Sequence, residues 1–309
     1  MRTLFFGTPD IAVPALESLR QTTDLVGVVC QPDRRAGRGM TLTAPATKTH
    51  ALAHGLPVHQ PRRVRDEAFA AWVREQHVDY AVVIAYGRIL PRAVLEAPRG
   101  GCLNLHASLL PKYRGAAPIQ WAIVRGETET GVCLMQMDEG MDTGPVLARR
   151  TIPIGPDETA GELGARIATL AATVVREDLP RAPTLSAVAQ DHDAATSAPM
   201  LSRSDGRIDW TAPAVEVHDH VRGMTPWPGA HTTLGDAPLK ILRTTRVQEP
   251  VDGAEPAPGT VRTVGKKRVL IACGSGWVDL QRAQRPGRKA LGPADLLGGR
   301  VLCDGDQLV

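Results

Sequence analysis

The sequence has few aromatic side chains, which make up 4% of its 309 residues. Proteins that hold single-stranded nucleic acid stack its bases on aromatic rings, so a broad stacking surface is not expected. No apolar run approaches the ~18 residues that a membrane-spanning helix needs, and the first residues lead into a strand and a glycine turn, not into the core of a signal peptide. Neither charge sign dominates, since 36 Lys and Arg stand against 33 Asp and Glu. We therefore expect a cytoplasmic protein with no membrane partner and no DNA partner.

Cysteine is also scarce, with five residues that are widely spaced and include no Cys-x-x-Cys pair. This spacing indicates neither a disulfide framework nor a zinc site, so we expect reduced thiols. Two histidine pairs, His50 with His54 and His218 with His220, have no third ligand in the sequence around them, and we expect no metal. The G-T-P-D turn after the first apolar run is not G-x-G-x-x-G, which disfavours a nicotinamide cofactor.

The first half of the chain alternates short apolar runs with helix-like stretches. The runs have the length of strands and lie at residues 4–6, 25–29, 80–85, 102–105 and 132–137. Residues 66–76 predict a helix with Phe69, Trp72 and Val73 on one face. Apolar strands separated by helices predict a parallel sheet that is covered on both faces. Thr159 and Glu162 have the spacing of a capping box and open a long amphipathic helix.

The composition changes between about residues 180 and 206, where prolines punctuate a polar stretch of little periodicity. This predicts a linker. Beyond it, short β runs separated by turns predict a small β-barrel or sandwich. We therefore divide the chain into a catalytic domain (residues 1–188), a linker (189–205) and a C-terminal domain (206–309).

Basic residues cluster in the second domain. Eight of them lie between residues 260 and 290 and are opposed only by Asp279. A charge cluster is most often a solvated face, and the other interpretation is contact with a phosphate backbone. The cluster alone does not decide between the two.

Asn104 and His106 lie two residues apart at the end of a predicted strand, so both side chains project from the same face. The carboxyl ends of strands line the ligand crevice in open α/β sheets. An amide and an imidazolium aimed at one point can hold a developing oxyanion, and the histidine can move a proton if a carboxylate supports it. A glycine-flanked acidic loop at residues 138–144 offers that carboxylate. Taken singly, each residue is more often a strand-end hydrogen bond or a turn, whereas together they are more specific.

The sequence resembles the 10-formyltetrahydrofolate-dependent formyltransferases. The resemblance rests on three motifs, N-x-H-x-S-L-L-P at residues 104–111, R-G-A-A-P-I-Q at 114–120 and D-x-G-x-D-T-G at 138–144, and extends over essentially the whole chain. It implies an α/β fold in which a Rossmann-like, mostly parallel sheet is followed by a smaller C-terminal β-barrel (OB-like) domain. It also implies 10-formyltetrahydrofolate as the formyl donor.

The resemblance also implies which residues are catalytic and which bind the folate. The catalytic residues it implies are Asn104, His106 and Asp142. The folate-binding residues it implies are Ser108, Leu109, Leu110 and Pro111, together with the backbone of Arg88, Ile89 and Leu90.

The first long loop and the C-terminal motifs resemble the family members that act on methionyl initiator tRNA. For this acceptor we expect tRNA contacts from Arg38 in a glycine-rich loop and from Lys266, Lys267 and Arg268 in the basic cluster. The sequence departs from the family in the linker, where Ser197 and Met200 replace the usual tyrosine and lysine, and at Thr225, where asparagine is common.

Three alternatives stay open. One is formyl transfer to a small amine, either glycinamide ribonucleotide or an amino-sugar nucleotide, although such an acceptor needs no second domain. Another is a non-catalytic folate- or tRNA-binding protein. The third is a hydrolase that releases formate from the same folate.

Overall fold

The computed structural model describes residues 1–36, 39–247 and 256–309, and the chain folds into two compact units. The first unit comprises Met1–Pro118, Glu129–Ile152 and Gly164–Pro199, and the second comprises Ile119–Thr128, Pro153–Leu163 and Met200–Val309. Arg38 lies outside the described residues.

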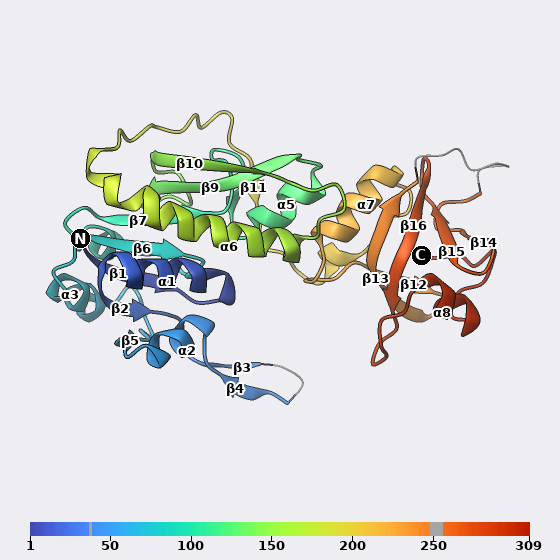
Figure 1. Ribbon diagram of the computed structural model, residues 1–309, viewed down its shortest axis with the longest axis horizontal. Coiled ribbons are helices and arrows are strands. Elements are labelled where there is room, and N and C mark those ends of the chain that lie inside the picture. The colour runs from blue at the N-terminus through green and yellow to red at the C-terminus, as the bar shows by residue number, and fades with distance from the viewer. Residues whose placement is uncertain (37–38, 248–255) are drawn as a thin grey trace. The chain divides into compact units, whose positions relative to one another are not determined.

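A seven-stranded sheet of strand order β10-β9-β7-β6-β1-β2-β5 forms the framework of the first unit (Figure 1). Its strands are β1 (Arg2–Gly7), β2 (Asp24–Val29), β5 (Val58–His59), β6 (Tyr80–Ile84), β7 (Cys102–His106), β9 (Glu129–Gln136) and β10 (Val146–Pro153). The strands from β5 to β7 pair in parallel, and β9 pairs antiparallel with β7. The prediction of a Rossmann-like, mostly parallel sheet is confirmed.

Helices pack on both faces of this sheet. They are α1 (Val13–Thr22), α2 (Ala46–Ala53), α3 (Glu67–Glu75), α4 (Arg92–Leu95) and most of α6 (Ala160–Glu177). Helix α5 (Pro118–Val124) belongs almost entirely to the second unit. Because side chains alternate along β1, Leu4 and Phe6 share one face, where they join a buried cluster with Phe69 of α3. On the other face α1 and α6 lie side by side (Figure 1), and the Ser18 hydroxyl donates to the Ala172 carbonyl at 2.9 Å.

The five apolar runs of the sequence correspond to β1, β2, β6, β7 and β9. The predicted capping box is also present: the backbone N–H of Thr159 donates to Glu162 Oε2 at 2.8 Å, and the N–H of Glu162 donates to Thr159 Oγ1 at 3.3 Å. Strand β10 was not predicted. It is an edge strand that contains an exposed arginine, Arg149, and a partly buried one, Arg150, which pairs with Asp178 at 2.6 Å, so its sequence has no continuous apolar run.

The second unit contains a five-stranded antiparallel sheet of order β12-β13-β16-β15-β14. Its strands are β12 (His231–Leu234), β13 (Ala237–Arg246), β14 (Val261–Val264), β15 (Arg268–Ala272) and β16 (Trp277–Gln284), and its helices are α7 (Ala214–Gly223) and α8 (Pro293–Gly298). The edge strands β12 and β14 do not pair with each other among the described residues. Instead the chain's last residues bridge them: Val309 exchanges backbone hydrogen bonds with Thr233 at 2.9 and 3.0 Å, and the Val261 N–H donates to Asp306 O at 2.8 Å. The predicted small β domain is thus an antiparallel sheet whose edges are connected through the C-terminal segment.

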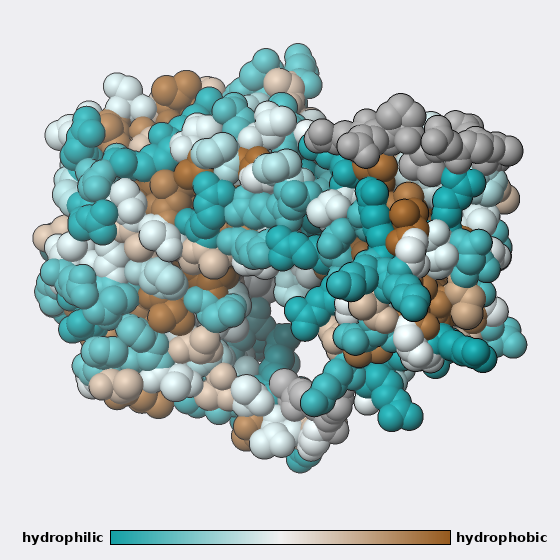
Figure 2. Space-filling model, turned by 45° about the vertical axis from the view of Figure 1, so that its right-hand side comes forward, coloured by the Kyte–Doolittle hydropathy of each residue, from teal (hydrophilic) through white to brown (hydrophobic). Residues whose placement is uncertain are grey.

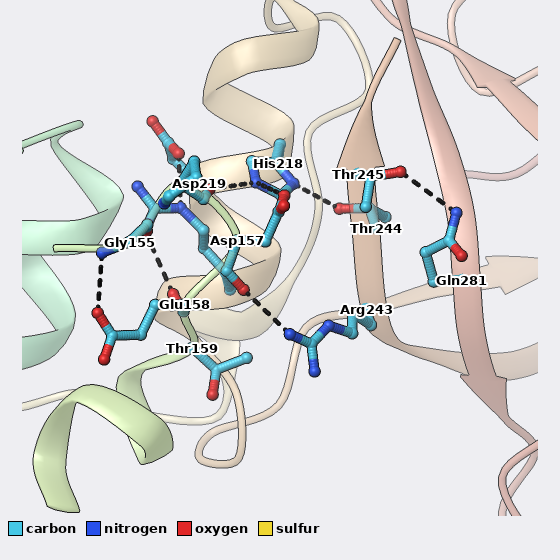
Figure 3. A network of polar contacts seen from close by, with 12 residues as sticks. Gly155, Asp157, Glu158, Thr159, His218, Asp219, Arg243, Thr244, Thr245 and Gln281 are labelled. Carbon is cyan, nitrogen blue, oxygen red and sulfur yellow. Dashed lines mark hydrogen bonds and ion pairs between the residues drawn. The ribbon is translucent and has the colours of Figure 1, made fainter.

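Helix α7 holds a loop of the second unit through buried polar side chains (Figure 3). His218 Nε2 donates to the Pro156 carbonyl at 2.9 Å, and its Nδ1 lies 3.0 Å from the Thr244 hydroxyl. Burial lowers the pKa of His218, in keeping with a neutral ring that uses one nitrogen as donor and the other as acceptor. Arg222 pairs with Asp219 at 2.8 Å and also donates to two carbonyls of the 155–158 loop. In the sequence pair of His218 and His220, His218 is thus a buried structural residue.

All five cysteines are free, and all except Cys303 are buried. None of the helices in the described part of the chain combines the length and the apolar character that crossing a bilayer demands. On the face seen in Figure 2, hydrophilic residues cover most of the surface and hydrophobic residues occur in small separate groups.

Candidate active site

Strand β7 ends at the edge of the sheet with Asn104 and His106, which project from one face of the strand as predicted. The strand lies between β6, where Val83 is the partner of Asn104, and β9, where Cys133 is the partner of His106. The His106 side chain is 6% exposed, and Asn104 is partly exposed. The carboxyl end of a central strand therefore presents a sheltered imidazole beside an accessible amide.

Asp142 reaches these two residues from the loop between β9 and β10. Its Oδ1 accepts a hydrogen bond from Asn104 Nδ2 at 3.3 Å, and its Oδ2 accepts one from the Gly115 N–H at 2.9 Å. His106 Nδ1 lies 3.6 Å from Asp142 Oδ2, which is the distance of an ion pair and too long for a hydrogen bond. The structure thus brings together the three residues that the sequence singles out.

The His106 ring is held by a hydrogen bond from one nitrogen, and its other nitrogen faces a carboxylate. Nε2 donates to the Tyr113 carbonyl at 2.8 Å, while Nδ1 faces the Asp142 carboxylate. A carbonyl oxygen accepts only, so Nε2 carries a hydrogen. The bond to Tyr113 fixes the plane of the ring and leaves Nδ1 turned toward the Asp142 carboxylate.

The loop from Ser108 to Pro111 follows directly after these residues. The Ser108 hydroxyl donates to the Lys112 carbonyl at 2.6 Å, so it stabilises the loop itself. The Leu110 side chain is buried in a small apolar cluster, and the peptide bond between Leu110 and Pro111 is cis. Leu109 and Pro111 are partly exposed. Leu109 and Pro111 are therefore the residues of this loop that solvent reaches, whereas Ser108 and Leu110 are buried.

The second predicted folate loop, Arg88 to Leu90, follows β6, the parallel neighbour of β7, and so lies at the same edge of the sheet. Gln31 Nε2 donates to the Tyr86 and Gly87 carbonyls at 2.8 and 3.2 Å. Arg88 donates to the carbonyl of Arg62 at 2.9 Å, Ile89 is 60% exposed and Leu90 is buried. Side-chain hydrogen bonds from Gln31 and Arg88 thus hold the chain around this loop, and Ile89 is its exposed side chain.

Residues 1–179 match the model described as "Formyl transferase", and residues 200–300 match "Formyl transferase, C-terminal domain". The chain belongs to the formyl transferase family.

The chain is similar over nearly its full length to proteins that are called methionyl-tRNA formyltransferases. A methionyl-tRNA formyltransferase of Sorangium cellulosum is 60% identical over 98% of this chain and 97% of its own length, and one of Myxococcus xanthus is 47% identical over 99% and 97%. Among solved structures, an N-formyltransferase of Helicobacter canadensis with folinic acid and dTDP-3-aminofucose has a TM-score of 0.69 at 18% identity and covers 92% of this chain and 98% of that one. A methionyl-tRNA formyltransferase from Clostridium thermocellum has a TM-score of 0.56 at 16% identity, with 89% and 100% covered. The solved structures show that the fold is shared.

In this formyl transferase, part of the stretch between residues 189 and 205 pairs with the loop beside His106. Strand β11 (Ser197–Ala198) runs parallel to β8 (Arg114–Gly115). Tyr113 N–H donates to Thr196 Oγ1 at 2.9 Å. A Cβ on Gly115 would lie 2.6 Å from the Ala198 carbonyl, so only glycine permits this approach. Sequence reasoning missed this contact because a polar stretch of little periodicity carries no signal for a two-residue strand.

The predicted tRNA residues of the second unit lie around the turn between β14 and β15. Lys266 and Lys267 are exposed, and neither has an ion-pair partner in the described parts of the chain. Arg268 donates to Asp279 at 2.6 Å, which neutralises part of its charge. The two lysines therefore offer more free charge than the arginine does.

His50 on α2 and His54 directly after that helix have a third potential ligand that their spacing did not reveal. Glu17 of α1 joins His50 and His54, with ligand atoms within 4.8 Å of one another. Glu17 already binds the Arg20 guanidinium through both oxygens at 2.7 and 2.8 Å, and this contact is the main reason that its pKa is lowered to about 2. The carboxylate is thus neutralised by a cation of the protein itself.

Proposed function

We propose that the protein transfers the formyl group of 10-formyltetrahydrofolate to the α-amino group of methionyl initiator tRNA, giving N-formylmethionyl-tRNA for translation initiation. The main support is the convergence of Asn104, His106 and Asp142 at the carboxyl edge of the sheet. Relatives named for this reaction match nearly the full length of the chain. A charged initiator tRNA as acceptor implies that the protein acts in the cytoplasm.

The first step is attack of the neutral amine on the formyl carbon, which produces a tetrahedral intermediate with a negative oxygen. Asn104 gives one N–H to Asp142, and its second N–H has no partner among the described residues. That N–H and the Nδ1–H of His106 would bind the oxyanion. Each such donor contributes about 3 kcal/mol of barrier lowering, or roughly 100-fold in rate.

The attacking amine must lose a proton, and N10 of the folate must gain one as it leaves. Asp142 is the carboxylate beside the reacting groups, and its Oδ2 already accepts from Gly115 and faces His106. In our proposal Asp142 keeps His106 charged and oriented, and accepts the amine proton either directly or through one water. The proton then passes to N10, which balances the transfer.

The folate would lie between two backbone segments, residues 88–90 and residues 108–111. Backbone N–H and C=O groups of these loops suit the donor and acceptor pattern of a pterin ring. The reaction needs no metal in this scheme, because the oxyanion is held by hydrogen-bond donors.

For the tRNA we propose contacts from Arg38 in the first unit and from Lys266 and Lys267 in the second, with Arg268 contributing less because Asp279 shares its charge. In functional terms, residues 1–188 would carry the chemistry, 206–309 would bind the tRNA and 189–205 would link them. A small acceptor such as an amino-sugar nucleotide would give the lysines of the second unit no partner.

The decisive experiment varies the acceptor. Purified protein and 10-formyltetrahydrofolate are mixed with methionyl initiator tRNA, uncharged tRNA or no tRNA, and release of tetrahydrofolate is followed. We expect release only with the charged tRNA, with the formyl label on the methionine amine. Release without tRNA would identify a hydrolase or a small-amine transferase instead, and no release under any condition would identify a binding protein.

A further inference from the structure

Gln190 is a buried polar residue that the mechanism above does not use. It follows a short antiparallel bridge between Val188 and Val146, and the residue is 6% exposed. It lies 48 residues from Asp142 along the chain, outside every motif that carries the family resemblance, yet the two residues are in direct contact.

The Gln190 amide makes every hydrogen bond that a primary amide can make. Its Nε2 donates to the carbonyl of Asp142 at 2.9 Å and to that of Gly144 at 2.7 Å. Its Oε1 accepts from Nε and Nη2 of Arg114 at 3.1 and 2.8 Å. Two donors and two lone pairs are thus all engaged. A flipped amide would place an oxygen against two carbonyls, so only one orientation is possible.

The two carbonyls that Gln190 binds belong to a strained part of the loop. Asp142 has φ 55°, a left-handed conformation that costs a residue with a Cβ about 1–2 kcal/mol. Close packing adds to the constraint, since a Cβ on Gly144 would lie 2.0 Å from the Gln136 carbonyl. Strained backbone persists only where its surroundings hold it. Gln190 supplies such a hold on both sides of Thr143.

The same partners also reach the Asp142 carboxylate. Arg114 binds the Gln190 side chain, and its neighbour Gly115 donates its N–H to Asp142 Oδ2. The Arg114 N–H in turn donates to the Thr196 carbonyl at 2.9 Å. Gln190 therefore holds the backbone of Asp142, and Gly115, the residue after Arg114, holds its carboxylate.

We propose that Gln190 is a positioning residue for formyl transfer, acting through the backbone of Asp142 to keep that carboxylate beside His106 and Asn104. This inference rests on the function proposed above. The hydrogen bonds of the Gln190 side chain go to Arg114, Asp142 and Gly144, and none goes to the predicted folate loops or to the lysines proposed to contact tRNA. Its loss should therefore affect the chemical step rather than substrate binding.

The test uses two variants of nearly the same side-chain length. Gln190→Met fills the space without hydrogen bonds, and Gln190→Glu keeps a partner for Arg114 but turns an oxygen toward the two carbonyls. Because small misplacements of a catalytic group cost up to about 100-fold in rate, we expect kcat to fall at least about 10-fold in Gln190→Met and further in Gln190→Glu. The KM values for folate and for methionyl-tRNA should stay within threefold.

A matched control separates positioning from stability. Asp178→Asn weakens the ion pair that the buried Asp178 makes with Arg150 elsewhere in the first unit. This variant should lower Tm and leave kcat unchanged at 25 °C. All variants are assayed well below their Tm. If Gln190→Glu fails to fold, the kcat of Gln190→Met alone tests the inference.

Unchanged kcat in Gln190→Met, alongside an active wild-type protein, would overturn the inference. A rise in KM at constant kcat would also overturn it, because Gln190 would then shape a binding surface. Absence of formyl transfer in the wild-type protein would instead refute the proposed function, and this inference with it.

Discussion

Replacing Asp142 by asparagine removes one charge from the candidate site and preserves the shape of the side chain. The carboxylate accepts from Asn104 at 3.3 Å and from Gly115 at 2.9 Å, and it faces His106 Nδ1 at 3.6 Å. An asparagine amide has one acceptor oxygen for these three donors. Whichever way the amide turns, its NH2 group faces a donor, which costs about 1–3 kcal/mol as an unmet hydrogen bond.

The lost charge sets the scale of the kinetic effect. Two unit charges 3.6 Å apart attract by about 4–5 kcal/mol at an effective dielectric constant of about 20. The side chains of His106 and Asp142 are only 6% and 17% exposed, so solvent screens this pair little. If two-thirds of the attraction supports the charged imidazole in the transition state, about 3 kcal/mol is lost, which corresponds to roughly 100-fold in rate. We therefore expect kcat of Asp142→Asn to fall at least about 100-fold.

The assay is single-turnover formyl transfer to methionyl initiator tRNA, combined with a direct measurement of folate binding. Folate affinity should stay within threefold, because the predicted folate contacts come from other loops. Glu139→Gln is the matched control, since it removes an exposed carboxylate from the same loop and should leave the rate unchanged. An Asp142→Asn variant that keeps more than a third of the wild-type rate would refute the role of the ion pair.

Three further predictions concern stability and tRNA binding. Arg222→Leu leaves the buried Asp219 carboxylate without its cation and should lower the free energy of unfolding by about 3–5 kcal/mol in urea titration, whereas a loss below 1 kcal/mol would show that the pair is dispensable. Charge removal at Lys266 and Lys267 should flatten the slope of log K against log salt for tRNA by about 0.7–0.9 per phosphate contact, and an unchanged slope would identify a solvated face. The pKa of Glu17 falls from 4.5 in the unfolded chain to about 2 in the folded protein, so its stabilisation is present above pH 4.5 and is lost as the pH falls towards 2. Glu17→Gln should remove this part of the acid dependence, and an acid profile identical to that of the wild type would contradict it.

The elements of the fold that could be predicted are those whose own residues form the core. The run that became β6 is buried along nearly its whole length, and the stripe of α3 packs into the same cluster, so their patterns report burial directly. Strand β10 and the C-terminal segment that bridges β12 and β14 gave no such pattern. Their positions depend on hydrogen bonds with distant strands, and a backbone hydrogen bond leaves little trace in residue type.

The candidate site was predictable for a different reason. Asn104 and His106 stand at a strand end, where geometry alone places two alternate side chains on one face. Geometry did not select Asp142 from the acidic loop, and the choice depended on the family resemblance. In the structure the choice has a physical cause, because Asp138 of the same loop accepts from the Thr143 hydroxyl and the Gly140 N–H and so stabilises the loop itself.

Residues that react and residues that hold them in place differ in how clearly the sequence reveals them. A reacting group must have one particular chemistry, so Asn104 and His106, taken together with the acidic loop, form a pattern that the sequence reveals. A holding group only needs a donor or an acceptor at the right place, and Gln190 meets that need from a stretch whose composition resembles a linker. Substitutions in that stretch should therefore reduce turnover without touching any recognisable motif. Thr196 holds the loop through its backbone carbonyl as well as through its hydroxyl, so Thr196→Ala keeps one of the two hydrogen bonds. Gln190 holds the Asp142 loop through its side-chain amide, and Gln190→Met removes those hydrogen bonds. Thr196→Ala should therefore have a smaller effect on kcat than Gln190→Met.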